Sequence, residues 1–145
     1  MARTSTAHTR WEGDLQSGSG KTDLSSGAAD TLTMSWRART ENEERATSPE
    51  ELIAAAHSAC FSMALSNILA KAGTPPTSLE TTASVIFEQT DSGFGISSVA
   101  LRVEGDVPGI SEDDFAEAAN TAKDNCPVSK ALAGNVAISV ESALA

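Results

Sequence analysis

Two cysteines carry the clearest chemical signal in this sequence. Cys60 lies inside a long apolar segment, and Cys126, the only other thiol, lies much later in the chain. In a reducing compartment, two cysteines are more often free, catalytic or redox-sensing than a structural crosslink. Taken alone, either cysteine is better explained as a small buried hydrophobe, because cysteine is among the most buried residue types. The presence of two, each in a distinctive setting, favours redox chemistry.

The later cysteine has a local environment suited to an anion. Cys126 directly precedes Pro127, a residue that fits the first position of a helix. Unpaired backbone amides and the helix dipole at such a position stabilise negative charge. The sequence therefore predicts that Cys126 serves as a thiolate or as a good leaving group.

The segment that carries Cys60 begins with a complete helix-start signal. Ser48 is suited to cap the first free amides, and Pro49 fits the first helical position. Glu50 and Glu51 lie in the first turn, where the helix dipole favours negative charge. Glu51, three residues after Ser48, also predicts a capping box.

The helix is expected to continue to Lys71, because residues 52–71 contain neither Gly nor Pro and Gly73 follows. Apolar residues at spacings of three and four predict one apolar face around Cys60, which is expected to be buried. The residues of this predicted face are Leu52, Ile53, Ala56, Cys60, Met63, Ala64 and Ile68.

The remaining segments indicate an α+β fold, since strands are grouped instead of alternating singly with helices. Ser111 is expected to cap a second long helix, and a short helix is expected from Pro127 to Gly134. Strands with antiparallel pairing are expected at 9–15, 21–25 and 31–39, a hairpin with one buried face at 79–87 and 96–104, and a closing strand at 135–142.

Composition narrows the class of protein. The chain has 145 residues, within the size of one domain, so a single domain over 1–145 is expected. A formal net charge of −10 argues against nucleic acid or an anionic membrane surface as partner. Residues 1–11 contain no apolar run typical of a signal peptide, and no stretch is expected to reach the length of a membrane span. A cytoplasmic location is expected.

Two long motifs resemble the OsmC/Ohr family of thiol-dependent organic hydroperoxide reductases, and within it the OsmC branch. They are SPEELIAAAHSACFSMALS at 48–66 and NCPVS at 125–129. The resemblance covers the whole chain, including WEGD at 11–14 and VPGI at 107–110. It implies a single OsmC-like peroxidase domain over 1–145. It also implies an intertwined homodimer in which curved antiparallel sheets wrap two central helices and both active sites lie at the interface.

The resemblance also implies roles for four residues. Cys60 matches the reactive cysteine of the family and Cys126 the resolving cysteine. Glu50 matches a glutamate that holds an arginine, and this arginine stabilises the thiolate and orients the peroxide. Arg39 is the best match for the arginine, with Arg37 as the alternative, because the segment 40–47 carries an extra residue relative to typical members. Without the resemblance, helix-dipole stabilisation is the favoured role of Glu50, and a solvated strand end is the favoured setting of Arg39.

The implied activity is reduction of organic hydroperoxides to alcohols in oxidative or osmotic stress defence. Cys60 is expected to form a sulfenic acid, and Cys126 to convert it to a disulfide. The resemblance implies that dihydrolipoyl groups on protein carriers, or another dithiol, reopen the disulfide. No bound cofactor and no metal are expected. Apolar walls would favour bulky organic peroxides over hydrogen peroxide.

Alternatives remain at the level of residues and of the whole protein. His57, three residues before Cys60, suggests a Cys–His nucleophile or a zinc site with Cys126, but a packed or interface histidine is favoured. The rival functions are a non-catalytic stress-response or ligand-binding protein and a redox sensor on the same scaffold.

Overall fold

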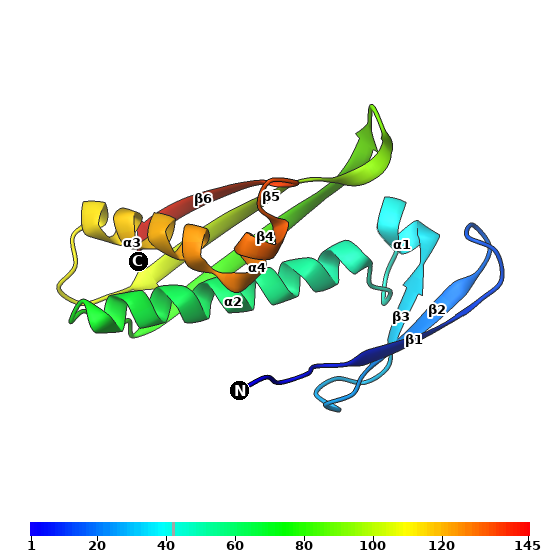
Figure 1. Cartoon of the computed structure of the whole chain (residues 1–145), viewed down its shortest axis with the longest axis horizontal. Helices are drawn as coiled ribbons and strands as arrows, with labels where there is room; N and C mark the ends of the chain where they lie inside the picture. Colours follow the sequence, from blue (N-terminus) through cyan, green and yellow to red (C-terminus); the bar gives the residue numbers. More distant parts are fainter. Residues whose placement is uncertain (42) are drawn as a thin grey trace. The chain divides into compact units, whose positions relative to one another are not determined.

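The computed structural model describes residues 1–41 and 43–145, so Asn42 lies outside the described residues. The chain divides into two compact units, Met1–Leu52 and Ile53–Ala145. Figure 1 shows the elements of each unit coloured along the sequence. Both units combine helices with a small sheet, which confirms the expected α+β class.

The first unit contains an antiparallel sheet of β1 (Ala7–Glu12), β2 (Ser19–Leu24) and β3 (Leu32–Ser35), in that order. The third strand was expected to run to residue 39, and this expectation is wrong. Helix α1 (Trp36–Thr40) replaces its second half. The Ser35 hydroxyl caps α1 by accepting a 3.0 Å hydrogen bond from the amide of Ala38. Arg39 therefore lies on a short helix instead of at the end of a strand.

Helix α2 (Pro49–Lys71) starts in the first unit and continues through the second. The expected cap is present, since the Ser48 hydroxyl accepts a 3.1 Å hydrogen bond from the Glu51 amide. The expected capping box is incomplete. The Glu51 carboxylate accepts a 2.6 Å hydrogen bond from the hydroxyl of Thr47. The Glu51 side chain thus holds Thr47, the residue before the cap residue Ser48.

The second unit contains the predicted hairpin, β4 (Ser78–Thr90) and β5 (Gly93–Asp106), closed by a tight turn at 91–92. Strand β6 (Ala137–Leu144) pairs with β5 in parallel, so the expectation of a purely antiparallel sheet is wrong here. Two helices, α3 (Glu112–Asn125) and α4 (Pro127–Leu132), connect β5 to β6. A helical crossover of this length returns the chain in the same direction, which makes the pairing parallel.

The core of the second unit lies between this sheet and its helices, which cover one face of the sheet in Figure 1. Helix α2 contributes a buried stripe at four-residue spacing: His57, Phe61, Leu65 and Leu69. This stripe differs from the predicted apolar face, of which Cys60, Ala64 and Ile68 are only partly buried against the core. Cys60 is half-buried and Met63 is 73% exposed in this chain. Because α2 is apolar over most of its circumference, periodicity did not identify the face that packs.

The expectation that no stretch reaches the length of a membrane span is wrong, because α2 reaches it. It has 23 residues and an 18-residue window with a mean hydropathy of 1.5, of which 22% is buried. Central helices of proteins without membrane segments pass the same test, so length and composition do not by themselves assign α2 to a membrane. One face of α2 is already covered by the protein core.

Candidate active site

The structure brings the two cysteines together. Cys60 lies near the middle of α2, and Cys126 is the residue that joins α3 to α4, serving as C-cap of one and N-cap of the other. Cys126 is fully buried and Cys60 half-buried, and both thiols are free. The Cys60 and Cys126 side chains are within hydrogen-bond reach of each other. The second unit thus holds a reduced dithiol formed by residues distant in sequence.

The environment of Cys60 acts on its ionisation in opposite directions. Burial raises the pKa of the Cys60 thiol, and a hydrogen bond and charge repulsion from Cys126 raise it further. A hydrogen bond from the backbone N–H of Val128 lowers the pKa of Cys60. The net effect is a raised pKa. A cation beside Cys60 would be needed to make the thiolate abundant at neutral pH.

A backbone amide at the start of α4 acts on Cys60 and not on Cys126. The sequence predicted that the first-turn amides of this helix would stabilise a Cys126 thiolate. In the structure, Cys126 makes no side-chain capping bond to α4, and the amide of Val128 is directed to Cys60. An amide of the first helical turn has no acceptor within the helix, so it is available to a sulfur on a neighbouring element.

A hollow of about 490 Å³ opens beside the exposed side of Cys60. Its walls come from α2 and from the α3–α4 junction, and they are mainly apolar with two amide side chains. The lining residues are Cys60, Met63, Ala64, Asn67, Ile68, Asn125 and Pro127. The hollow is large enough for a small organic molecule and gives access to the thiol.

The first unit holds the predicted arginine–glutamate pair. The Arg39 Nε donates to Glu50 Oε1 at 3.0 Å, and its Nη2 donates to the same oxygen at 2.7 Å. Both donors therefore reach the same oxygen of the Glu50 carboxylate. Glu50 is buried, and its Oε2 has no hydrogen-bond partner among the described residues. A buried carboxylate needs a charged or hydrogen-bonding partner, and Arg39 is such a partner.

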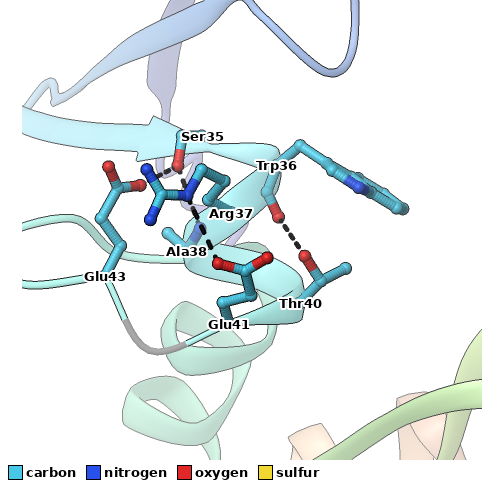
Figure 2. Close-up of polar contacts among 7 residues, drawn as sticks. All are labelled: Ser35, Trp36, Arg37, Ala38, Thr40, Glu41 and Glu43. Atoms are coloured by element: carbon cyan, nitrogen blue, oxygen red, sulfur yellow. Dashed lines mark hydrogen bonds and ion pairs between the residues drawn. The ribbon is translucent and has the colours of Figure 1, made fainter.

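Arg37 lies in a different environment, shown in Figure 2. Its Nε contacts Glu41 Oε2 at 3.4 Å, one turn along α1, and both side chains are more than half exposed. Exposed pairs of this kind contribute little to stability. Of the two arginines, Arg39 is therefore the one that contacts Glu50, which supports its selection over Arg37.

His57 is fully buried, as expected for a packed histidine. Its Nε2 lies 2.7 Å from the hydroxyl of Ser129 on α4, and burial lowers the pKa of His57. Cys126 and Val128 are the neighbouring groups that shift the pKa of Cys60, and His57 is not among them. In the described part of the chain, no three side chains of His, Cys, Asp or Glu come together as metal ligands.

The four predicted residues thus form two contacts, Arg39 with Glu50 in the first unit and Cys60 with Cys126 in the second. Sequence reasoning missed two contacts, that of the Val128 amide with Cys60 and that of the Ser129 hydroxyl with His57. Val128 and Ser129 both lie in the motif that contains Cys126, where Ser129 is three positions after Cys126, just as Cys60 is three positions after His57. That equal spacing was the available signal.

The sequence matches the family model described as OsmC-like protein over residues 40–141. This range contains Glu50 and both cysteines, and Arg39 lies immediately before it. The chain is 44% identical over 128 residues to Peroxiredoxin OsmC from Escherichia coli, covering 88% of this chain and 89% of that protein. It is 33% identical over 112 residues to organic hydroperoxide resistance protein OhrA from Bacillus subtilis, covering 76% and 77%.

Solved structures show the same fold. An organic hydroperoxide resistance protein from Elizabethkingia anophelis aligns with a TM-score of 0.78 and 25% identity, covering all of both chains. The protein OhrB of Bacillus subtilis aligns with a TM-score of 0.74 and 26% identity, covering 95% of this chain and 98% of the other. The fold of this chain is therefore one already seen in crystals.

Proposed function

The chain belongs to the OsmC family and is a peroxidase that acts on organic hydroperoxides, and we propose that Cys60 is its peroxidatic cysteine and Cys126 its resolving cysteine. The observation that carries this proposal is the reduced Cys60–Cys126 pair, formed by two free thiols within hydrogen-bond reach. Cys60 is the thiol that borders the hollow, while Cys126 is buried behind it. The exposed thiol is the one that a peroxide reaches first.

The proposed reaction has two steps at the protein. The Cys60 thiolate attacks the distal oxygen of the hydroperoxide, which breaks the O–O bond and leaves Cys60 as a sulfenic acid. The leaving alkoxide takes a proton and departs as the alcohol. The Cys126 sulfur then attacks the Cys60 sulfur, forming the disulfide and releasing water. The disulfide protects Cys60 from irreversible oxidation to the sulfinic acid.

Arg39 and Glu50 are proposed to support the first step. A guanidinium held by the buried Glu50 carboxylate has a fixed orientation, and it stabilises the thiolate and the charge that develops on the leaving oxygen. The raised pKa of Cys60 is the reason that such a cation is needed. An arginine suits this role because its planar donors are fixed relative to one another.

The family and the hollow support proposals for the substrate, the reductant and the assembly. The apolar lining of the hollow supports a peroxide with an organic tail, which adds buried apolar area. A dithiol, with dihydrolipoyl groups on protein carriers as the first choice, is proposed to reduce the disulfide by exchange. We also propose that residues 1–145 act as one domain in a cytoplasmic homodimer, with a role in oxidative or osmotic stress defence.

A turnover assay with an organic hydroperoxide and dihydrolipoamide tests the proposal. The wild-type protein is expected to consume peroxide through many cycles, while Cys60→Ser consumes none. Replacing dihydrolipoamide with reduced glutathione is expected to slow turnover. Peroxide consumption by Cys60→Ser at the wild-type rate would remove Cys60 from the mechanism, and a ligand-binding or sensor function would then be the better account.

A further inference from the structure

Two side-chain contacts join α2 to the start of α4, and one of them has no role in the reaction described so far. The first is Cys60 with Cys126, and the second is His57 with Ser129, where Nε2 and Oγ are 2.7 Å apart. His57 is fully buried and Ser129 is 3% exposed. A hydrogen bond shielded from water in this way is strong and sensitive to geometry.

The spacing relates the two contacts. His57 lies three residues before Cys60 on α2, and Ser129 lies three residues after Cys126 at the start of α4. The segments therefore run past each other in opposite directions with contacts at both ends of one helical turn. A second contact one turn away constrains the orientation of α4 more tightly than the first contact alone, in addition to the core packing of Val128 and Leu132. The His57–Ser129 bond thus holds the turn that contains Cys126 and Val128.

Protonation favours a structural role for the imidazole. Burial lowers the pKa of His57, so the neutral ring is the stable form at neutral pH. His57 Nδ1 is buried without a hydrogen-bond partner among the described residues. A buried N–H without an acceptor is more costly than an unpaired ring nitrogen, which places the proton on Nε2, donating to Ser129. The ring therefore offers no proton to the sulfur chemistry.

We propose that His57 and Ser129 are positioning residues for disulfide closure, holding Cys126 in line with the oxidised sulfur of Cys60. The proposal rests on the proposed function, because it presupposes the Cys60 sulfenic acid and the resolving role of Cys126. Disulfide formation has narrow geometric limits, so a small displacement of α4 slows it. A slower closure gives a second peroxide more time to convert the sulfenic acid to the sulfinic acid.

The test separates the first oxidation from closure. Peroxide is mixed with reduced protein, sulfenic acid formation and disulfide formation are followed by rapid quenching, and products are identified by intact mass. Ser129→Ala and His57→Leu remove the bond, while His57→Gln keeps a donor near the position of Nε2. The matched control is Ser62→Ala, which removes another 2.7 Å hydrogen bond of α2, the one to the hydroxyl of Thr81 on β4.

Ser129→Ala and His57→Leu are expected to slow closure about tenfold and to increase the sulfinic fraction, with the first oxidation within about twofold of wild type. His57→Gln is expected to close faster than His57→Leu, and Ser62→Ala to match wild type. Circular dichroism checks that each variant folds. If Ser129→Ala does not fold, the comparison of closure rates between His57→Gln and His57→Leu tests the proposal.

The inference would be overturned by wild-type closure in Ser129→Ala, by equal slowing of both steps, or by identical closure in His57→Gln and His57→Leu. Absence of the Cys60–Cys126 disulfide in the wild-type protein would instead refute the proposed function, so the two failures are distinguishable.

Discussion

At the scale of single residues, the environment of Cys60 combines a raised pKa with a neighbouring thiol that contributes to it. The same Cys126 that is proposed to resolve the sulfenic acid also suppresses the Cys60 thiolate before oxidation. Close approach of the two sulfurs is required for rapid disulfide formation, so some loss of thiolate follows from the same geometry. Val128 and, in the proposed mechanism, Arg39 act against this loss.

Cys126→Ala tests this coupling directly. The substitution removes the hydrogen bond and the charge repulsion that raise the pKa of Cys60, so this pKa is expected to fall. A lower pKa gives more thiolate at neutral pH, and alkylation of Cys60 by iodoacetamide should become faster there. The measurement is the alkylation rate against pH, with Cys60→Ser as the background. A profile displaced to higher pH would contradict the account.

Arg39→Ala tests the proposed cation. Loss of the guanidinium is expected to raise the pKa of Cys60 and to lower the rate constant for peroxide reduction on the order of a hundredfold. Arg39→Lys should recover only part of the rate, since an ammonium lacks the fixed donors that reach Glu50. Rates are measured by stopped flow.

Arg37→Ala is the matched control, because the side-chain contact of Arg37 within the described residues is an exposed one with Glu41. Its rate should stay within about twofold of wild type. A large loss in Arg37→Ala with a small loss in Arg39→Ala would reverse the assignment.

At the scale of elements, the position of Cys126 depends on how α3 packs on β5. Phe115 of α3 is fully buried, and its ring lies over Gly105 of β5. A Cβ at Gly105 would lie 2.6 Å from Cζ and 2.9 Å from Cε2 of this ring. Glycine is therefore required there for close packing, and a larger residue would push α3, with Cys126 at its end, away from the sheet.

Gly105→Ala is expected to lower the free energy of unfolding by about 1–3 kcal/mol, the usual cost of overpacking a core. The matched control is Gly95→Ala on the same strand, where an added Cβ meets no described atom within 4 Å. Urea unfolding compares the two variants. Equal stability of Gly105→Ala and wild type would show that α3 adjusts without cost.

The elements also show how far the sequence alone led. Capping and turn residues placed the helices from Pro49 and Glu112, the hairpin and the short helix after Pro127 close to their observed bounds. The prediction for α2 missed its fully buried stripe, because nearly every side of that helix is apolar. Helix α1 was missed because its only local signal in the sequence is the cap residue Ser35. The parallel pairing of β6 with β5 was missed because strand pairing depends on tertiary structure, which the local sequence pattern does not encode.

For the candidate site too, some features could be predicted from the sequence and others required the structure. Cys60, Cys126, Arg39 and Glu50 could be selected as candidates because residue type, spacing and family motif pointed to them together. The Arg39 contact with a single oxygen of Glu50 and the Val128 amide at Cys60 were not predicted, because both depend on side-chain and backbone directions in three dimensions. The His57–Ser129 bond was missed for the same reason.

At the scale of the whole molecule, α2 leaves apolar surface exposed in the single chain. Only 22% of its most apolar window is buried, and Met63 is 73% exposed. An apolar surface of this kind is typical of a protein interface, which supports the proposed homodimer. The hollow beside Cys60 includes Met63, so a second copy on this face would also complete its walls.

The thermal midpoint of unfolding is expected to rise with protein concentration. If the second copy covers the apolar surface of α2, the separated monomer is not stably folded, so unfolding is coupled to dissociation. Sedimentation equilibrium over the same concentrations should give the dimer mass, and peroxidase activity should fall in parallel with any dissociation. A folded, active monomer at low concentration would contradict the proposed assembly.

The central claim is that Cys60 and Cys126 of one chain form the catalytic disulfide. The most direct measurement is intact mass spectrometry of reduced protein after one molar equivalent of an organic hydroperoxide, under denaturing conditions without reductant. The account predicts a single-chain product lighter by two hydrogens, with peptides containing Cys60 and Cys126 joined. A covalent dimer linked through Cys60 of two chains as the main product, or an unchanged mass, would contradict it.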